Sequence, residues 1–421
     1  MAREGPCFYW HPGAGETGAP LAAAAGDLVF HAGGVAALPE TGVPEGIAAL
    51  DGYPHHWSRI NRELSYIYET AAEVLGRAGS DLRQAMKINS FHTEAKDVYE
   101  ALRLRPSVFG AEPPASTLVL VPELPVRDAR VMLDMVALKR DAPREALTAS
   151  TQGAPMPPHE RIWGSVIYAK AVRGGGFIFT SGRTNNVIGG ASDGTARGHP
   201  DFPYALDRAE ATCRMILDYL ADVLSSFRAR LADAVKAEIH LSDMTQIAAI
   251  DRVWRETFPD DPPARIFVPA AFPTTYSTME IELVVRDPAG PWDREVLGDA
   301  ATRRGHEPDA VRSGPYIFHS GLSASARVHG LAPDARIDPA FPFHEDPARR
   351  EMQVIVDRLG VLSALVPLRR RVFTPDLTRL AAMEAVWTGA LGPCPTTPVQ
   401  VTAPLPIPAT SVLVDCISWV G

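Results

Sequence analysis

Apolar and polar positions follow the same order three times along this chain. Each round opens with an apolar run that ends in a small residue and a glycine, at positions 28–33, 177–182 and 316–321. Apolar residues then recur at steps of three and four, which is typical of an amphipathic helix. A second apolar strand, a second helix and a closing pair of strands follow. The pattern therefore predicts three copies of a ββαβαββ-like unit.

The helices and strands are clearest in the first two rounds. The first helix of round one is expected to begin near Ser58, a suitable N-cap, and to end at Gly76 and Gly79. Its inward face carries Ile60, Leu64, Ile67, Ala71 and Val74. The matching helix of round two turns inward Leu206, Ala209, Cys213, Ile216, Leu217 and Leu220. Alternation over 235–241 predicts a half-buried strand after that helix.

Spacing relates the rounds to one another. Ala32 and Ser181 are as far apart along the chain as Ser116 and Arg265, so the first two rounds keep register. The third round keeps the spacing over its second half. We expect an N-terminal extension (1–25) followed by three units: a degenerate one (26–140), one that retains its site residues (159–287) and a second degenerate one (306–421). Linkers at 141–158 and 288–305 would join them.

The order of strands and helices indicates an α+β fold with a three-fold architecture. Each unit has only two helices, enough to cover one face of its sheet, so the other face needs a partner. Three such faces packed around a common axis would bury one another. We therefore expect one chain to form an intramolecular pseudo-trimer, with helices outside and sheets around a central axis.

Composition narrows the class of protein. With 421 residues, 46% hydrophobic and 22% charged, the chain has the balance of a soluble globular protein. A net charge of −9 argues against nucleic acid and anionic membranes as partners. The four cysteines show no metal-binding spacing, so we expect no metal. No signal peptide or membrane span is evident, and a cytoplasmic location is expected.

Round two resembles the Rid (YjgF) family of small homotrimeric reactive-intermediate deaminases. The matching residues cover nearly the whole round, in order: 168–172, 178–182, 232–236, 243–244, 263–265, 272–273 and 279–282. Rounds one and three match more loosely, through their strand–glycine openings and helix patterns. The resemblance implies the chorismate-mutase-like fold of that family, with its trimer fused into one polypeptide.

The resemblance also implies a site between neighbouring units. By position, Arg265 would hold a substrate carboxylate and Glu280 would move protons or place water. Tyr168 and Ser181 would line the cavity. The family has an asparagine where this chain has Asp251 and a cysteine where it has Phe267. The predicted site therefore consists of six residues: Tyr168, Ser181, Asp251, Arg265, Phe267 and Glu280.

The arginine and glutamate positions have changed in the other two rounds. The arginine position reads Ser116 in round one, and Thr397 or Pro398 in round three. The glutamate position reads Met132 and Leu413. We therefore expect one family-type site, seated in the second unit.

The residue types suit the chemistry of a C=N bond. A guanidinium fits a carboxylate with two parallel hydrogen bonds. A glutamate in a half-dry pocket has a raised pKa, suited to acid–base work near neutrality. We expect hydrolytic deamination of a carboxylate-bearing imine or enamine, with Arg265 as the anchor and Glu280 as the proton-transfer group. No cofactor is required, because the iminium carbon is already electrophilic.

Other interpretations remain open. A chorismatase-like enzyme is one, although its late catalytic glutamate would fall at Asp415-Cys416 here. An enzyme that condenses or cyclises an imine is another, and a non-catalytic binder of carboxylate ligands or of proteins is a third. In each case a monomer would be sufficient to complete the body, with a higher oligomer left open, and a small anionic molecule is the expected ligand.

Two sets of charged side chains are expected to have no catalytic role. Glu282 shares the sheet face of Glu280 and is interpreted as a residue of a water-filled central channel. The run 369–371, three arginines, is interpreted as the solvated end of a loop.

Overall fold

Three mixed sheets form the body of the protein. The computed structural model describes residues 5–12, 16, 18–38, 42–48, 59–148, 167–185, 207–274, 277–298, 305–326, 330–360, 365–402 and 404–421. The predicted N-cap Ser58, the helix residue Leu206 and much of the two predicted linkers lie outside these residues. We call each sheet with its helices a unit and number the units along the chain.

Unit 1 contains the sheet β1-β2-β3-β6-β4-β5. Its strands are β1 (Cys7–Tyr9), β2 (Ala22–Ala25), β3 (Leu28–Val35), β4 (Ala85–His92), β5 (Ala115–Leu120) and β6 (Val131–Leu138). Its helices are α1 (Glu45–Ala48), α2 (Arg59–Arg77) and α3 (Ala95–Phe109). Only β4 and β5 run parallel, because α3 crosses over between them.

Unit 2 contains the sheet β12-β11-β13-β9-β8-β7, with β10 also on β13. Its strands are β7 (Arg144–Leu147), β8 (Ala171–Gly174), β9 (Phe177–Thr180), β10 (Arg183–Thr184), β11 (Ala234–Leu241), β12 (Ala264–Pro269) and β13 (Met279–Arg286). Its helices are α4 (Asp207–Ser225) and α5 (Ile247–Thr257). The expected strand 235–241 is therefore β11.

Unit 3 contains the sheet β14-β15-β16-β22-β20-β21, with β17 also on β22. Its strands are β14 (Arg294–Leu297), β15 (Ala310–Ser313), β16 (Tyr316–His319), β17 (Leu322–Ser323), β20 (Leu365–Thr374), β21 (Thr396–Gln400) and β22 (Leu413–Val420). Its helices are α6 (Pro347–Gly360) and α7 (Leu380–Leu391), and a small ribbon of β18 (Ser325–Ala326) and β19 (Gly330–Leu331) lies beside them.

Short strands occupy segments that the sequence indicated were irregular. The extension 1–25 supplies β1 and β2, the linker 141–158 supplies β7, and the linker 288–305 supplies β14. Each of these strands pairs antiparallel with a neighbour, as β14 does with β15. Three or four residues are too few to show a period, so their polar and proline-rich surroundings conceal them.

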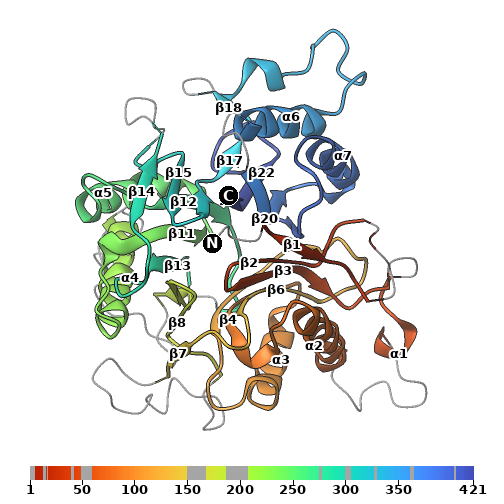
Figure 1. Ribbon diagram of the computed structural model, residues 1–421. Coiled ribbons are helices and arrows are strands. Elements are labelled where there is room, and N and C mark those ends of the chain that lie inside the picture. Colours follow the sequence, from red (N-terminus) through yellow and green to blue (C-terminus); the bar gives the residue numbers. More distant parts are fainter. Residues whose placement is uncertain are drawn as a thin grey trace.

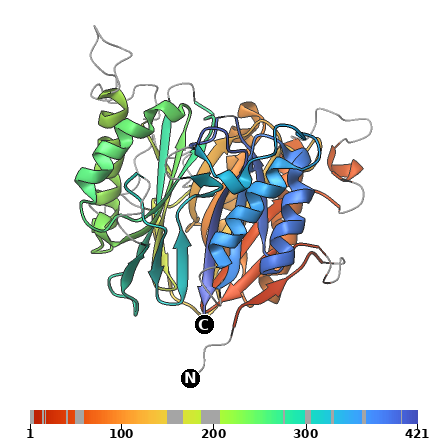
Figure 2. The ribbon, with the colours of Figure 1, turned by 90° about the horizontal axis from the view of Figure 1, so that it is seen from above.

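The three units surround a shared interior, with the helices outside (Figure 1). Figure 2 shows α4, α6 and α7 along the outer side of their sheets. Aromatic rings of two units interlock in the interior: the centroid of Phe177 in unit 2 lies 5.4 Å from Tyr316 and 5.3 Å from Phe318 in unit 3. Phe30 of unit 1 joins them, 6.3 Å from Tyr316. The interior is therefore one continuous core.

Charged side chains form a second layer inside this core. Lys87 of unit 1 lies 2.9 Å from Glu282 of unit 2, which also accepts a hydrogen bond from Asn89. Lys236 of unit 2 and Arg369 of unit 3 both contact Asp415, at 2.7 and 2.9 Å. Glu282 is thus held by one buried ion pair and one hydrogen bond. The Asp415 carboxylate, where a chorismatase-like enzyme would have its glutamate, is buried between two cations.

Arg371 joins all three units. From β20 of unit 3, its Nε donates to Asp134 of unit 1 at 2.6 Å, and its Nη1 contacts Glu238 of unit 2. The side chain is fully buried. The interpretation of 369–371 as a solvated loop end was therefore wrong. An ion pair whose partners come from distant parts of the chain leaves no local sequence signal.

Candidate functional site

The units meet in three joints, and the first two repeat the same main-chain contact. We call the contact of units 1 and 2 the first joint, that of units 2 and 3 the second, and that of units 3 and 1 the third. At the first joint, Gly182 donates to the carbonyl of Ser116 (3.0 Å), and the Ser116 amide donates to Ser181 Oγ (2.8 Å). At the second joint, Gly321 donates to the carbonyl of Arg265 at 2.9 Å. Equivalent side chains can therefore be compared between joints.

Arg265 and Glu280 do not share a site. On β11, Ala237 is the register partner of both Arg265 and Leu283, so these three side chains point to the same face, the one covered by α4 and α5. Glu280 is three positions from Leu283 on β13 and points to the opposite, inner face. Arg265 consequently belongs to the second joint and Glu280 to the first.

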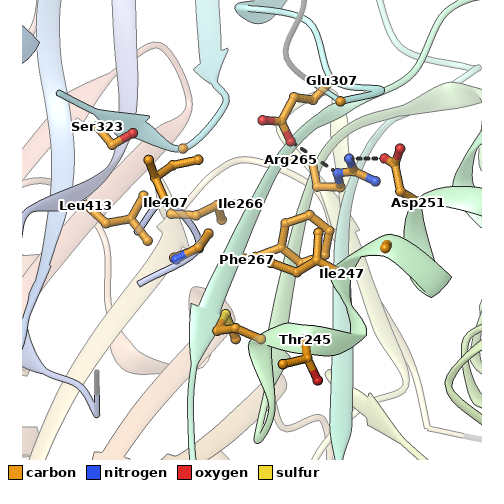
Figure 3. A pocket seen from close by; sticks show the side chains of 15 residues that line it. Thr245, Ile247, Asp251, Arg265, Ile266, Phe267, Glu307, Ser323, Ile407 and Leu413 are labelled. Atoms are coloured by element: carbon orange, nitrogen blue, oxygen red, sulfur yellow. Dashed lines mark hydrogen bonds and ion pairs between the residues drawn. The ribbon is translucent and has the colours of Figure 1, made fainter. Parts of the chain in front are cut away.

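Arg265 lines a cavity of about 400 Å³ at the second joint. Its Nη2 donates to Asp251 at 2.7 Å and its Nε donates to Glu307 at 3.3 Å. The guanidinium carbon lies 4.6 Å from the ring centroid of Phe267 and 5.2 Å from that of Trp254. Figure 3 shows the guanidinium between the two carboxylates, with Phe267 beneath it. Three of the six predicted residues, Arg265, Asp251 and Phe267, thus meet here.

Unit 3 supplies the far wall of this cavity. Glu307 precedes Ser320 by as many residues as Tyr168 precedes Ser181, so a carboxylate takes the tyrosine position. Leu413 takes the glutamate position and packs beside Gly321.

Although burial raises the pKa of Asp251, hydrogen bonds from Arg265 and Arg255 lower it overall, so Asp251 is ionised near neutrality.

Glu280 lies at the first joint with Ser181. Its carboxyl group packs so closely against Gly182 that any Cβ there would overlap it, and Thr117 of unit 1 borders the same point. Ser181 Oγ donates to the carbonyl of Ala169 at 2.6 Å, and Tyr168 is the residue before Ala169 in the chain. Ser181 and Glu280 therefore lie on the unit 2 side of this joint, and the place of the Tyr168 side chain in it stays a prediction.

Glu280 has the electrostatics of a proton-transfer group. Burial raises its pKa to about 7; His240 opposes the shift and the Glu282 carboxylate adds to it. The residue is 5% exposed, and its Oε2 has no hydrogen-bond partner among the described residues. Such a carboxyl group changes its protonation state near neutral pH.

A buried guanidinium stands on the helix-covered side of every joint. At the first joint it comes from α3: Arg105 precedes Ser116 by as many residues as Trp254 precedes Arg265, and it donates to Ser116 Oγ at 2.7 Å. At the third joint it comes from β20, where Arg370 donates to Thr396 Oγ1 at 2.9 Å.

The surroundings of these guanidinium groups also match. Arg370 lies 4.4 Å from the ring centroid of Trp387 and forms an ion pair with Glu384, which precedes Trp387 as Asp251 precedes Trp254. Sequence comparison at the position of Arg265 did not find Arg105 or Arg370. Each comes from a different element, although its guanidinium group occupies the equivalent location in its joint.

Two broader features concern the part of the chain that the structure describes. It contains no group of three histidine, cysteine, aspartate or glutamate side chains placed to hold a metal ion. None of its helices combines the length and the apolar character that crossing a bilayer requires.

Comparisons with known proteins agree with the resemblance of round two. A family model described as Endoribonuclease L-PSP matches residues 160–286. The mitochondrial protein mmf2 of Schizosaccharomyces pombe is 35% identical over 103 residues, which is 24% of this chain and 71% of mmf2.

Solved structures are more distant. A YjgF family member from Neisseria meningitidis is 19% identical, covering 35% of this chain and 98% of its own, with a TM-score of 0.26. A chorismatase is 15% identical over 67% of this chain and 80% of its own, with a TM-score of 0.41.

The protein has an α+β fold, and a cavity lies between units 2 and 3. The chain belongs to the Rid (YjgF) family. At the level of the family, membership supports imine deaminase-type or related chemistry.

Proposed function

We propose that the protein is an enzyme of imine or enamine chemistry, with Glu280 of the first joint as its acid–base group. The observation that carries the proposal is the buried Glu280 carboxyl group, which has a pKa of about 7 and whose Oε2 has no hydrogen-bond partner among the residues that the structure describes. A general base is most effective when its pKa lies near the working pH. The second joint has Leu413 at the equivalent position, which cannot move a proton.

The proposed reaction is the hydrolysis of a C=N bond. The Glu280 carboxylate takes a proton from water while the oxygen attacks the imine carbon. The protonated carboxyl group then gives that proton to nitrogen, which forms a carbinolamine. The regenerated carboxylate takes the proton of the carbinolamine hydroxyl and passes it to nitrogen as the C–N bond breaks, so ammonia or an amine leaves with a carbonyl product. One water is consumed for each C=N bond cleaved, and the glutamate ends in its starting state.

Arg105 would take the anchoring role expected of Arg265. It is 4% exposed and is tied to Ser116, whose amide donates to Ser181 Oγ. Its charge lies on the unit 1 side of the joint, where it would attract the carboxylate of an imino acid. The substrate class, a carboxylate-bearing imine or enamine, is the one implied by the family.

We further propose that the three units stand for the three subunits of the family's trimer, so one chain completes every joint. The repeated contacts at Ser116 and Arg265 support this, as does the shared aromatic core. Size-exclusion chromatography with light scattering would give a monomer mass of about 45.4 kDa. A trimer of chains would contradict it.

Point variants separate the first joint from the second. Imines are generated in situ from amino acids by an oxidase, and their hydrolysis is followed as released ammonia. Glu280→Gln keeps the side-chain volume and should lower kcat/KM by about 10² or more, the contribution of a positioned acid–base group. Arg105→Lys should raise KM, because an ammonium group loses the planar fork of donors.

Arg265→Ala is the matched control, because it removes a guanidinium from the other joint. It should leave kcat/KM within about twofold, since no step is assigned to it. Full activity in Glu280→Gln would refute the proposal. A loss in Arg265→Ala as large as in Glu280→Gln would refute the placement at the first joint.

A further inference from the structure

The strand pair that carries Glu280 differs from its counterparts in the other two units. On β11, His240 stands one residue before the end of the strand and is the register partner of Glu280 on β13. The same place on the other two sheets holds an apolar pair: Phe91 with Met132, and Phe373 with Leu413. These four side chains belong to one hydrophobic cluster. Only unit 2, among the described parts of the three sheets, therefore has a titratable pair at this place.

His240 and Glu280 are neighbours on the inner face of the sheet. Residues directly opposite each other on antiparallel strands point to the same face, with Cβ atoms about 4.5–5.5 Å apart. Both are buried, at 1% and 5% exposure. The imidazole Nε2 also lies 3.2 Å from Oε1 of Glu238, which precedes it on the same face of β11. The imidazole thus has two carboxyl groups beside it.

The remaining charges of this inner layer already balance. Its acids are as many as its lysines and arginines: Asp134, Glu238, Glu282 and Asp415, with Lys87, Lys236, Arg369 and Arg371. Each acid forms an ion pair with a lysine or arginine of this set. Among the described residues of the layer, His240 is thus the cation left to balance an ionised Glu280.

The charged groups around Glu280 agree with this balance. Those that face it are His240 and Glu238 from β11, Glu282 from β13 and Lys87 from β4. Arg183 of the neighbouring β10 is turned to α4, with its guanidinium carbon 4.1 Å from the ring centroid of Tyr219. Burial lowers the pKa of His240, but Glu238 and the other carboxylates raise it overall. The imidazole consequently keeps its proton to a higher pH than an ordinary histidine.

We propose that His240 is a positioning residue for Glu280: its imidazolium, held by Glu238, is the counter-ion of the Glu280 carboxylate when that group acts as a base. The role rests on the function proposed for Glu280. A buried carboxyl group ionises reluctantly, and an adjacent positive charge makes the ionised form available near neutral pH. Met132 and Leu413 never ionise, so an apolar ring suffices beside them.

Removing the charge of His240 should move the pH range of the reaction. His240→Phe brings in the residue type that both other units hold at this place, and His240→Gln is a smaller uncharged variant. A nearby opposite charge lowers a carboxyl pKa by about 1–3 units, so its loss should raise the pKa of Glu280 by about one unit or more. The midpoint of kcat/KM against pH should move from about 7 to about 8 or higher, and kcat/KM at pH 6 should fall about tenfold.

Infrared titration follows the same carboxyl group without catalysis. The carbonyl stretch of protonated Glu280 is the band that Glu280→Gln lacks, and its loss with rising pH is followed in the full chain without substrate. The midpoint should be about 7 in the wild type and about 8 or higher in both His240 variants. His319→Thr is the matched control, because burial lowers the pKa of His319 to about 4 and Thr180 is its equivalent in unit 2. It should leave both midpoints unchanged.

The two readouts separate this role from a structural one. Equal infrared midpoints in the wild type and both His240 variants would overturn the inference. A loss of kcat/KM that is the same at every pH would also overturn it, because a structural role lowers activity without moving the profile. Full activity in Glu280→Gln would instead refute the proposed function, whereas shifted infrared midpoints would still support the pairing of His240 with Glu280.

Discussion

Replacing Glu280 by glutamine should make the protein more stable at alkaline pH. The folded pKa of about 7 lies above the ordinary value of 4.5, because burial penalises the charged form. Between these two values the folded state binds more protons than the unfolded state, so the free energy of unfolding falls as pH rises. The stabilisation is therefore fully present below pH 4.5 and is lost by the time pH exceeds 7.

The size of the effect follows from the shift. A difference of about 2.5 units at about 1.4 kcal/mol each costs the wild type on the order of 3 kcal/mol at pH 8. Glutamine has a similar volume and no charge, so Glu280→Gln should match the wild type near pH 4.5 and exceed it by up to that amount at pH 8.

Urea unfolding at half-unit steps from pH 4.5 to 8.5 measures this difference. The seven tryptophans, including buried Trp254 and Trp387, report unfolding by fluorescence. Glu282→Gln is the control on the same strand face. It should lower stability by about 3–5 kcal/mol at pH 8, because it leaves Lys87 buried without its carboxylate. Equal pH slopes in Glu280→Gln and wild type would refute the reasoning.

Three further predictions follow from the site and the joints. The kcat/KM for imine hydrolysis should rise with pH through about 7 and level off, because Glu280 acts as a base once it is ionised; a profile flat from pH 5 to 9 would contradict this role. Arg371→Met should lower the free energy of unfolding by about 3–5 kcal/mol in urea titrations, because Asp134 remains buried without its guanidinium and Glu238 keeps only His240; an unchanged midpoint would count against the three-way contact. Gly33→Ala should destabilise the third joint, since its φ is 67° and a Cβ would overlap a main-chain carbonyl of unit 3; hydrogen exchange of β3 and β21 should increase, and unaltered protection would show that the joint tolerates the side chain.

Local patterns were enough to predict much of this molecule. The apolar strands that end in a glycine and the apolar faces of the helices predicted the α+β units. The motif matches around Arg265 and Glu280 identified the family. These signals are short-range, because each depends on the period of one element or on one motif. Strands of three or four residues, such as β1 and β7, are too short to carry a period.

The assignment of side chains to joints could not be predicted in the same way. Whether Arg265 and Glu280 share a face depends on the register of β12 and β13 against β11, which the sequence does not state. Arg105 and Arg370 come from α3 and β20, and neither stands at the position equivalent to Arg265. Only the coordinates show that a guanidinium group from a different element fills the same place in each joint.

The placement of Arg371 also sets an order of events on the ribosome. Its acidic partners, Asp134 and Glu238, are synthesised long before β20 emerges. Until then Asp134 lacks Arg371 and Glu238 has only His240 beside it, so closing units 1 and 2 around them would bury poorly compensated charge. Unit 3 therefore completes the charge balance at the centre, and a chain truncated before β20 is expected to leave units 1 and 2 unjoined.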